Sequence, residues 1–147
     1  MRIKRKSNKK ENKKVKNATP NTYNGIQFKS QLETYVYKQL KAHSLKADYE
    51  PIKFELIPSF VFCGKKIRAM TYTPDFIVEK NNHHFVLEVK GMPTDRYVVK
   101  RKLFLNYLKT QPTWHFFEVH TKRDMIFCIQ KIKEYEYSSP ENKKPSS

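Results

Sequence analysis

The stretch Thr73–Gly91, TPDFIVEKNNHHFVLEVKG, decides how the rest of the chain is interpreted. It contains two short apolar runs on either side of Asn81-Asn82, a residue pair that favours a tight turn. We therefore expect a β-hairpin. Pro74-Asp75 opens its first strand, and Glu88-Val89-Lys90 ends the second.

Acidic and basic side chains occupy defined places on this hairpin. Side chains alternate along a strand, so Glu88 and Lys90 share one face while the apolar residues between them can face the core. If the strands pair, Asp75 lies near Glu88. Two carboxylates and the backbone carbonyl of Val89 form a hard oxygen site suited to Mg²⁺, with Mn²⁺ as a substitute. Lys90 can orient water or neutralise charge on a phosphate, so the pattern predicts metal-dependent phosphodiester hydrolysis.

A purely structural interpretation of the same residues is also open. Thr73-Pro74-Asp75 can be a turn before a strand. Glu88 and Lys90 can be a same-face ion pair, and Glu33 can simply complete a helix capping box. Spacing alone does not choose between these interpretations.

The charge of the chain favours a polyanionic partner. It has 30 Lys and Arg against 14 Asp and Glu, a net charge of +16 over 147 residues. Such an excess is typical of nucleic-acid binding, although charge also aids solubility. Residues 1–24 contain nine of these bases and one acid, and the remainder keeps a net charge of +8. We expect a flexible, disordered basic arm over 1–24 that lies along phosphates, or else a solvated tail.

The elements around the hairpin predict a single α/β domain over residues 25–137, with a flexible tail over 138–147. A capping box, Ser30 to Glu33, begins an amphipathic helix. A strand region follows over 49–62, then a turn at Cys63-Gly64. A second helix over about 96–109, a strand and a last helix complete a central mixed sheet flanked by helices. The expected DNA contacts are Arg2, Lys4, Arg5, Lys6, Lys29, Lys100, Arg101 and Lys102.

Cysteine content and hydropathy indicate the cellular setting. Cys63 and Cys128 are too few for a disulfide framework or a zinc quartet, which favours a reduced, cytoplasmic environment. The basic N-terminus is not followed by an apolar run, and no stretch approaches the length of a membrane-spanning helix. We expect neither a signal peptide nor membrane association.

The motif order resembles a known group of nucleases. Pro74-Asp75 followed by Glu88-Val89-Lys90 is similar to the PD-(D/E)xK nuclease signature. Over residues 26–107 the chain resembles the phage endonuclease I family of Holliday junction-resolving enzymes. Related small phage nucleases and transposon-end nucleases contain similar segments. The segments that carry the likeness are Phe28-Lys29-Ser30-Gln31-Leu32-Glu33, Tyr49-Glu50, Thr71-Tyr72-Thr73-Pro74-Asp75-Phe76 and Glu88-Val89-Lys90-Gly91.

The resemblance implies a restriction-endonuclease-like fold and a division of roles in the site. Asp75 and Glu88 would be the principal metal ligands, Glu33 an additional acid and Lys90 the catalytic lysine. It implies branched DNA, especially four-way junctions, as substrate, a homodimer, and a bacterial cell with a phage-type gene as the setting. Family members can exchange segments before the proline-aspartate strand. Here the connection over 57–71 is longer and contains a turn signal, which favours a local hairpin instead.

Two other classes of function fit the same residues. One is a nuclease of the same fold with another substrate, such as a restriction-like, nicking or transposon-end enzyme. The other is a non-catalytic, basic DNA-binding protein whose acids are structural. Cleavage of DNA in the presence of Mg²⁺ separates the second class from the first.

Overall fold

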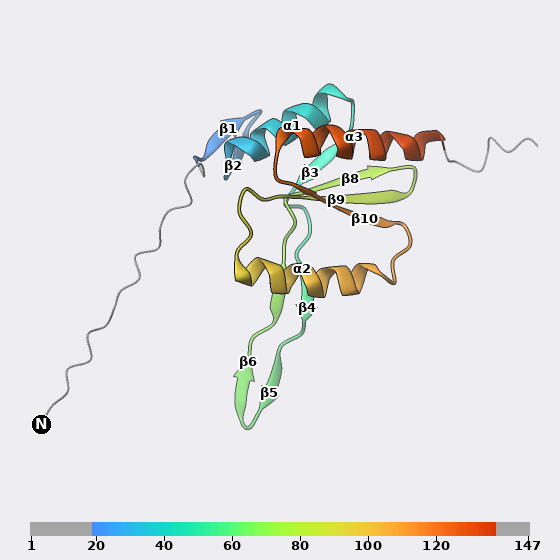
Figure 1. Cartoon of the computed structure of the whole chain (residues 1–147). Coiled ribbons are helices and arrows are strands. Elements are labelled where there is room, and N and C mark those ends of the chain that lie inside the picture. Colours follow the sequence, from blue (N-terminus) through green and yellow to red (C-terminus); the bar gives the residue numbers. More distant parts are fainter. Residues whose placement is uncertain (1–18, 138–147) are drawn as a thin grey trace, which may run out of the picture.

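A computed structural model describes residues 19–137 of the chain. Three helices surround a four-stranded sheet, and three two-stranded ladders are attached to it (Figure 1). The elements in chain order are β1 (Asn21–Tyr23), β2 (Ile26–Phe28), α1 (Gln31–Ala42), β3 (Ala47–Tyr49), β4 (Phe54–Ile57), β5 (Phe60–Phe62), β6 (Lys65–Ile67), β7 (Met70–Tyr72), β8 (Phe76–Lys80), β9 (His83–Val89), α2 (Asp95–Leu108), β10 (Trp114–Val119) and α3 (Lys122–Tyr137).

The central sheet has the strand order β10-β9-β8-β3. β10 runs parallel to β9, whereas β9, β8 and β3 pair antiparallel, so the sheet is mixed. Helices α1 and α3 lie on one side of the sheet and α2 on the other (Figure 1). The predicted α/β architecture with a mixed sheet flanked by helices is confirmed.

The β8–β9 hairpin forms as the sequence predicts. Its turn residues Asn81 and Asn82 have φ values of 49° and 62°, a left-handed geometry that asparagine tolerates better than most residues. The register pairs Lys80 with His83 at the turn and Phe76 with Leu87 at the far end. Continuing this register by one residue sets Asp75 opposite Glu88.

Strand alternation divides the apolar residues between two cores. Phe85, Leu87 and Val89 pack under α1 and α3, as expected. Val86, on the face that also carries Glu88, packs instead with Phe104 and other residues of α2. Both faces of β9 are therefore covered, and the acid lies at the end of a buried strand.

Two boundaries differ from the sequence-based expectation. Residues 21–24 were expected in a disordered arm, but β1 pairs with β2 in an antiparallel hairpin turned by Asn24-Gly25. The expected strand region over 49–62 is divided among β3, β4 and β5. Residues 1–18 and the 138–147 tail lie outside the described residues, and so do the expected contacts Arg2, Lys4, Arg5 and Lys6.

The connection between β3 and β8 forms a long extension. β4 pairs with β7, and beyond a bulge the chain continues into the β5–β6 hairpin, which projects from the body (Figure 1). Cys63 and Gly64 turn this hairpin with φ values of 48° and 73°. The expected local hairpin over this region is therefore present.

No helix in the described part of the chain is long and apolar enough to cross a membrane.

Candidate active-site cleft

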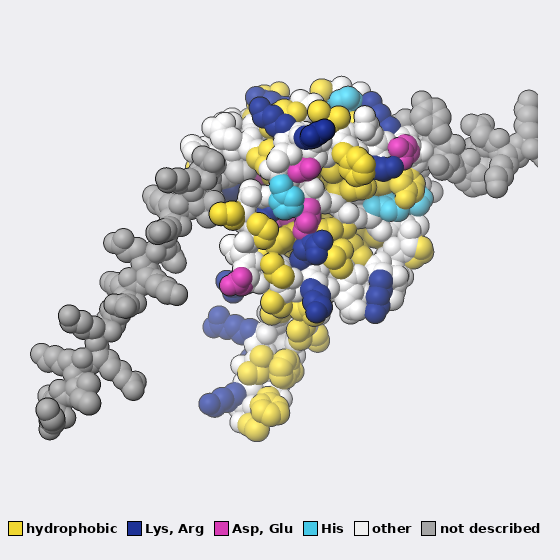
Figure 2. Space-filling view, viewed as in Figure 1, with side chains coloured by type: hydrophobic (Ala, Val, Ile, Leu, Met, Phe, Trp, Pro, Cys, Tyr) yellow, Lys and Arg dark blue, Asp and Glu magenta, His cyan; other side chains and the backbone are white. Residues whose placement is uncertain are grey.

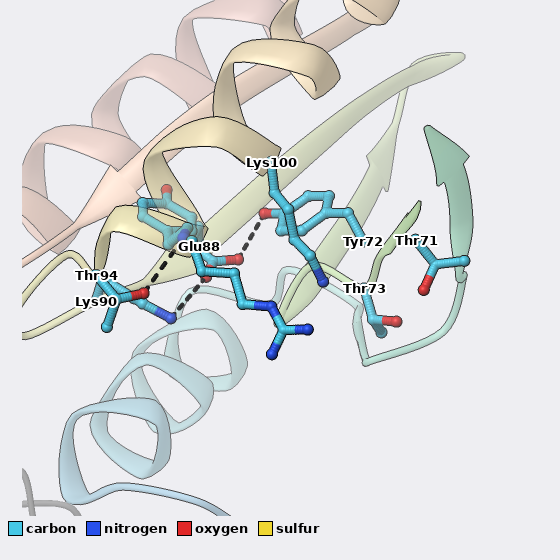
Figure 3. A pocket seen from close by; sticks show the side chains of 9 residues that line it. Thr71, Tyr72, Thr73, Glu88, Lys90, Thr94 and Lys100 are labelled. Atoms are coloured by element: carbon cyan, nitrogen blue, oxygen red, sulfur yellow. Dashed lines mark hydrogen bonds and ion pairs between the residues drawn. The ribbon is translucent and has the colours of Figure 1, made fainter. Parts of the chain in front are cut away.

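An open cleft of about 310 Å³ lies where the end of β9 meets β7 and the first turns of α2 (Figure 3). Glu88 lies at its floor, and Lys90, directly after β9, and Lys100 of α2 extend into it. Three cations and one carboxylate thus line a single depression. The lining residues are Thr71, Tyr72, Thr73, Glu88, Lys90, Thr94, Arg96, Tyr97 and Lys100.

Glu88 is held by contacts from both sides. The Tyr72 hydroxyl donates a hydrogen bond to Oε2 over 2.6 Å, and Lys90 Nζ lies 3.6 Å from Oε1 (Figure 3). Only 4% of the residue is exposed. Burial raises the pKa of Glu88, although the Tyr72 hydrogen bond and the Lys90 charge act in the opposite direction.

Asp75 precedes β8 and lies across from Glu88. Its Oδ2 accepts a hydrogen bond of 2.7 Å from the backbone N–H of Val89. Burial first, and then the negative charge of Glu88, raise the pKa of Asp75 to about 8. The sheet therefore brings the two acids of the predicted pair together. From the sequence we expected the backbone carbonyl of Val89 to bind metal. The structure adds a hydrogen bond from the backbone N–H of Val89 to Asp75.

The carboxylate of Glu33 accepts hydrogen bonds from neighbouring donors. It lies in the first turn of α1, where Ser30 Oγ caps its backbone N–H over 3.1 Å. Its carboxylate accepts hydrogen bonds from Lys29 N at 3.0 Å, Ser30 Oγ at 3.2 Å and the Tyr49 hydroxyl at 2.8 Å. The side chain is buried, and its charge contributes to the raised pKa of Asp75. The predicted third acid thus faces the same end of the sheet.

The donor set fits a divalent cation at Asp75 and Glu88. Both are oxygen donors, both are nearly buried, and each is destabilised in its charged form, so a hard cation would offset that cost. Within residues 19–137 no three His, Cys, Asp or Glu side chains are grouped closely enough to hold a metal. Glu33 is therefore not brought into a three-residue ligand set with the pair.

Lys90 is positioned by backbone and aromatic contacts. Its N–H donates to the Val119 carbonyl over 3.0 Å, and its own carbonyl lies 2.6 Å from Nδ1 of His120. Its ammonium lies 4.8 Å from the centre of the Tyr97 ring. These contacts hold the side chain at the cleft beside Glu88.

The four described cations that were expected to contact DNA have different surroundings. Lys100 lines the cleft, as the expected role requires. Lys102 is exposed on α2. Arg101 forms an ion pair with Glu118, and Lys29 forms one with Glu50, and neither residue is part of the cleft lining.

Several residues around the site were missed at the sequence level. Tyr72 and Arg96 line the cleft itself. Glu118 accepts hydrogen bonds from Arg101 and, over 2.6 Å, from the Tyr97 hydroxyl, and His120 Nε2 lies 3.4 Å from its second oxygen. Tyr72 directly precedes Thr73-Pro74-Asp75, and this adjacency was the one signal in the sequence that could have placed Tyr72 at the site. Glu118 and His120 lie in β10 or just after it, and nothing local relates them to β9.

Comparison with known proteins gives a family but no activity. A comparison with curated proteins found no match. A family model described as "Protein of unknown function (DUF1064)" matches residues 8–122, which include all three acids and Lys90. Because this match covers most of the 147 residues, the chain belongs to that family, DUF1064.

Proposed function

We propose that this chain is a divalent-metal-dependent endodeoxyribonuclease that hydrolyses phosphodiester bonds. The observation that carries the proposal is the placement of Asp75, Glu88 and Lys90 at one end of the β8–β9 hairpin, beside a cleft lined by further cations. A structural ion pair needs one acid and one base. Here a second buried acid, Asp75, raises the free-energy cost of ionising both carboxyl groups. Such an arrangement is typical of functional sites.

Each residue has a chemical role in this proposal. Asp75 and Glu88 would hold Mg²⁺ or Mn²⁺, with Val89 supplying a backbone oxygen. A bound cation of this kind supplies Lewis-acid activation of water and of the scissile phosphate. Lys90 stabilises negative charge as it develops on the phosphate, since its ammonium is already fixed near Glu88. Glu33 acts through Asp75, because its nearby negative charge contributes to the raised pKa of that carboxyl.

The surrounding cations suit a phosphate backbone. Arg96 and Lys100 come from the first two turns of α2 and line the same cleft as Glu88. They provide charge without an arrangement for reading bases, so recognition by DNA shape fits best. We propose a restriction-endonuclease-like fold and branched DNA, such as a four-way junction, as the substrate. A homodimer would then place two such clefts on one junction, in the cytoplasm of a bacterial cell, with a phage-type gene as one origin.

A cleavage assay with matched variants tests this proposal. The full chain should nick supercoiled plasmid and cut a four-way junction in Mg²⁺ or Mn²⁺, and chelation should stop both reactions. Glu88→Gln and Lys90→Ala should each reduce the rate by about 100-fold or more while junction binding remains. Glu134→Gln and Lys131→Ala, a surface pair on α3, are matched controls expected to cut at the wild-type rate.

Two results would contradict the proposal in different ways. If the wild-type chain binds DNA and does not cut any form with either metal, the chain is a binding protein. If a linear duplex of the same sequence is cut as fast as the junction, the chain is a nuclease without preference for branched DNA.

A further inference from the structure

The β5–β6 hairpin exposes an unusual amount of apolar surface. Phe62 is 67% exposed and Val61 71% exposed, although both lie in a regular strand. Ile57, Phe60 and Ile67 in the same extension are also exposed. Exposed apolar clusters of this kind mark interaction sites more often than isolated surface residues do.

The register gives this hairpin two different faces. Phe60 pairs with Ile67 and Phe62 with Lys65, so these side chains share one face, which is mostly apolar. Val61 pairs with Lys66 on the opposite face. Figure 2 shows hydrophobic side chains over the projecting hairpin and Lys and Arg side chains extending from one side of it.

The positive charge of the hairpin favours a negatively charged partner. Lys65, Lys66 and Arg68 lie within a segment, residues 56–70, that contains no acid. Two copies packed through this apolar face would bring their Lys65 ammonium groups together where apolar surface is desolvated, and would leave Lys66 on the other face without an anionic partner. A polyanion with accessible apolar surface is a better complement, and double-stranded DNA offers both phosphates and base edges.

The hairpin is continuous with the strand that borders the cleft. β6 leads directly into β7, and the last two residues of β7, Thr71 and Tyr72, line the cleft beside Glu88. DNA held with a phosphate at the cleft would therefore extend towards the hairpin.

We propose that the β5–β6 hairpin enters a groove of the DNA duplex next to the cleft. Phe60 and Phe62 would contact sugars and base edges, and Lys65, Lys66 and Arg68 would contact the flanking phosphates. The inference rests on the proposed function to the extent that the cleft receives DNA, and it adds an apolar recognition element to that site. Such an element acts on binding and leaves the chemistry of Glu88 and Lys90 untouched.

A pair of matched phenylalanine variants tests this role. Phe62→Ala should weaken binding of a fluorescein-labelled linear duplex by roughly tenfold, measured by anisotropy in EDTA, because the ring is no longer buried against the sugars and base edges of the groove. Phe127→Ala is the control, since Phe127 on α3 is 55% exposed and lies outside both the hairpin and the cleft lining. It should bind the duplex as wild type does. Circular dichroism verifies that both variants are folded.

A second readout uses Cys63 at the hairpin turn. Cys63 is exposed and Cys128 is buried, so a maleimide dye can be attached at the turn of the native chain. Added duplex should change the emission of this dye, and Lys65→Ala with Lys66→Ala should lower the slope of log affinity against log salt by roughly two. Wild-type duplex affinity in Phe62→Ala would overturn the inference, and so would a dye at Cys63 that does not respond to duplex.

Other outcomes separate this inference from the nuclease proposal. If Phe62→Ala weakens duplex binding but no form of the chain cuts DNA, the hairpin role stands and the nuclease proposal fails. If Phe62→Ala binds and cuts as wild type does, the nuclease stands and the hairpin role fails. If Phe62→Ala instead converts a dimer to a monomer in sedimentation with duplex affinity unchanged, the hairpin joins two copies of the chain and the inference is wrong.

Discussion

The Tyr72 hydroxyl donates a hydrogen bond of 2.6 Å to Oε2 of Glu88, within the cleft. This bond lowers the pKa of Glu88 against the larger, opposite effect of burial. Tyr72 is therefore a positioning residue for the central acid of the proposed site. Its own hydroxyl is kept protonated, because burial and then the charge of Glu88 raise its pKa.

Removing this hydroxyl should impair activity without unfolding the chain. Tyr72→Phe keeps the ring in its packing against Phe104 but leaves one oxygen of Glu88 without a donor. We expect kcat to fall by about tenfold. Because the lost bond lowers the pKa of Glu88, the acidic limb of the pH–rate profile should move to higher pH. An unchanged limb with reduced kcat would indicate a packing effect only.

Asp75 should make the metal-free protein less stable as pH rises. Its folded-state pKa of about 8 lies above its unfolded value of about 4, so the folded state holds a proton that the unfolded state releases between these values. Stability from this group is greatest below about pH 4 and is lost progressively up to about pH 8. In EDTA, Asp75→Asn should therefore gain in Tm relative to wild type as pH increases. Asp48→Asn, at an exposed position on β3, should show no such gain.

Divalent metal should reverse this loss of stability. A cation that binds the folded chain at a concentration 100-fold above its Kd adds about 2.7 kcal/mol to the free energy of unfolding. We expect Mg²⁺ or Mn²⁺ to raise the Tm of the wild type near pH 8, measured by scanning calorimetry. Glu88→Gln should lose most of this increase. An equal increase in wild type and Glu88→Gln would place the cation elsewhere.

The cations of α2 should separate into two groups in DNA binding. Arg96 and Lys100 line the cleft, so Arg96→Ala and Lys100→Ala should each lower the salt slope of DNA binding by roughly one. Arg101 is paired with Glu118, and this pair is partly exposed, so Arg101→Ala should leave the salt slope close to wild type. A loss of slope in Arg101→Ala equal to that in Lys100→Ala would show that the ion pair opens on DNA.

The two thiols should differ in reactivity. Cys63 is exposed at the hairpin turn, whereas burial raises the pKa of the Cys128 thiol to about 12. Maleimide at neutral pH should modify one thiol in the native chain and two after denaturation, as counted by mass spectrometry. Rapid modification of both thiols without denaturant would show that the α3 core opens readily.

The features that the sequence predicted correctly depend on local rules. The Asn81-Asn82 turn and the alternation along β9 set the hairpin register, and the register sets Asp75 against Glu88. The Ser30 cap of α1 is equally local, since donor and acceptor lie three residues apart. Neither prediction needed knowledge of tertiary packing.

The features that were missed depend on contacts between distant segments or on an overlooked turn. Arg101 lies 17 residues from Glu118, and only the packing of α2 on β10 brings them together. The arm boundary was wrong for a different reason. Asn24-Gly25 is a strong signal for a hairpin turn, but the surrounding basic composition directed the interpretation to disorder. At residues 21–28 the Asn24-Gly25 turn signal was a better guide to the structure than the basic composition of the segment before it.

The anchoring of Asp75 has a consequence for how this family can vary. Its carboxylate accepts from the Val89 amide, and its own carbonyl accepts from the Glu50 amide over 2.8 Å. Both donors are main-chain N–H groups, so substitution of residue 50 or residue 89 by any amino acid except proline keeps these hydrogen bonds. Relatives can therefore diverge widely around this acid and still present it at the same point in space.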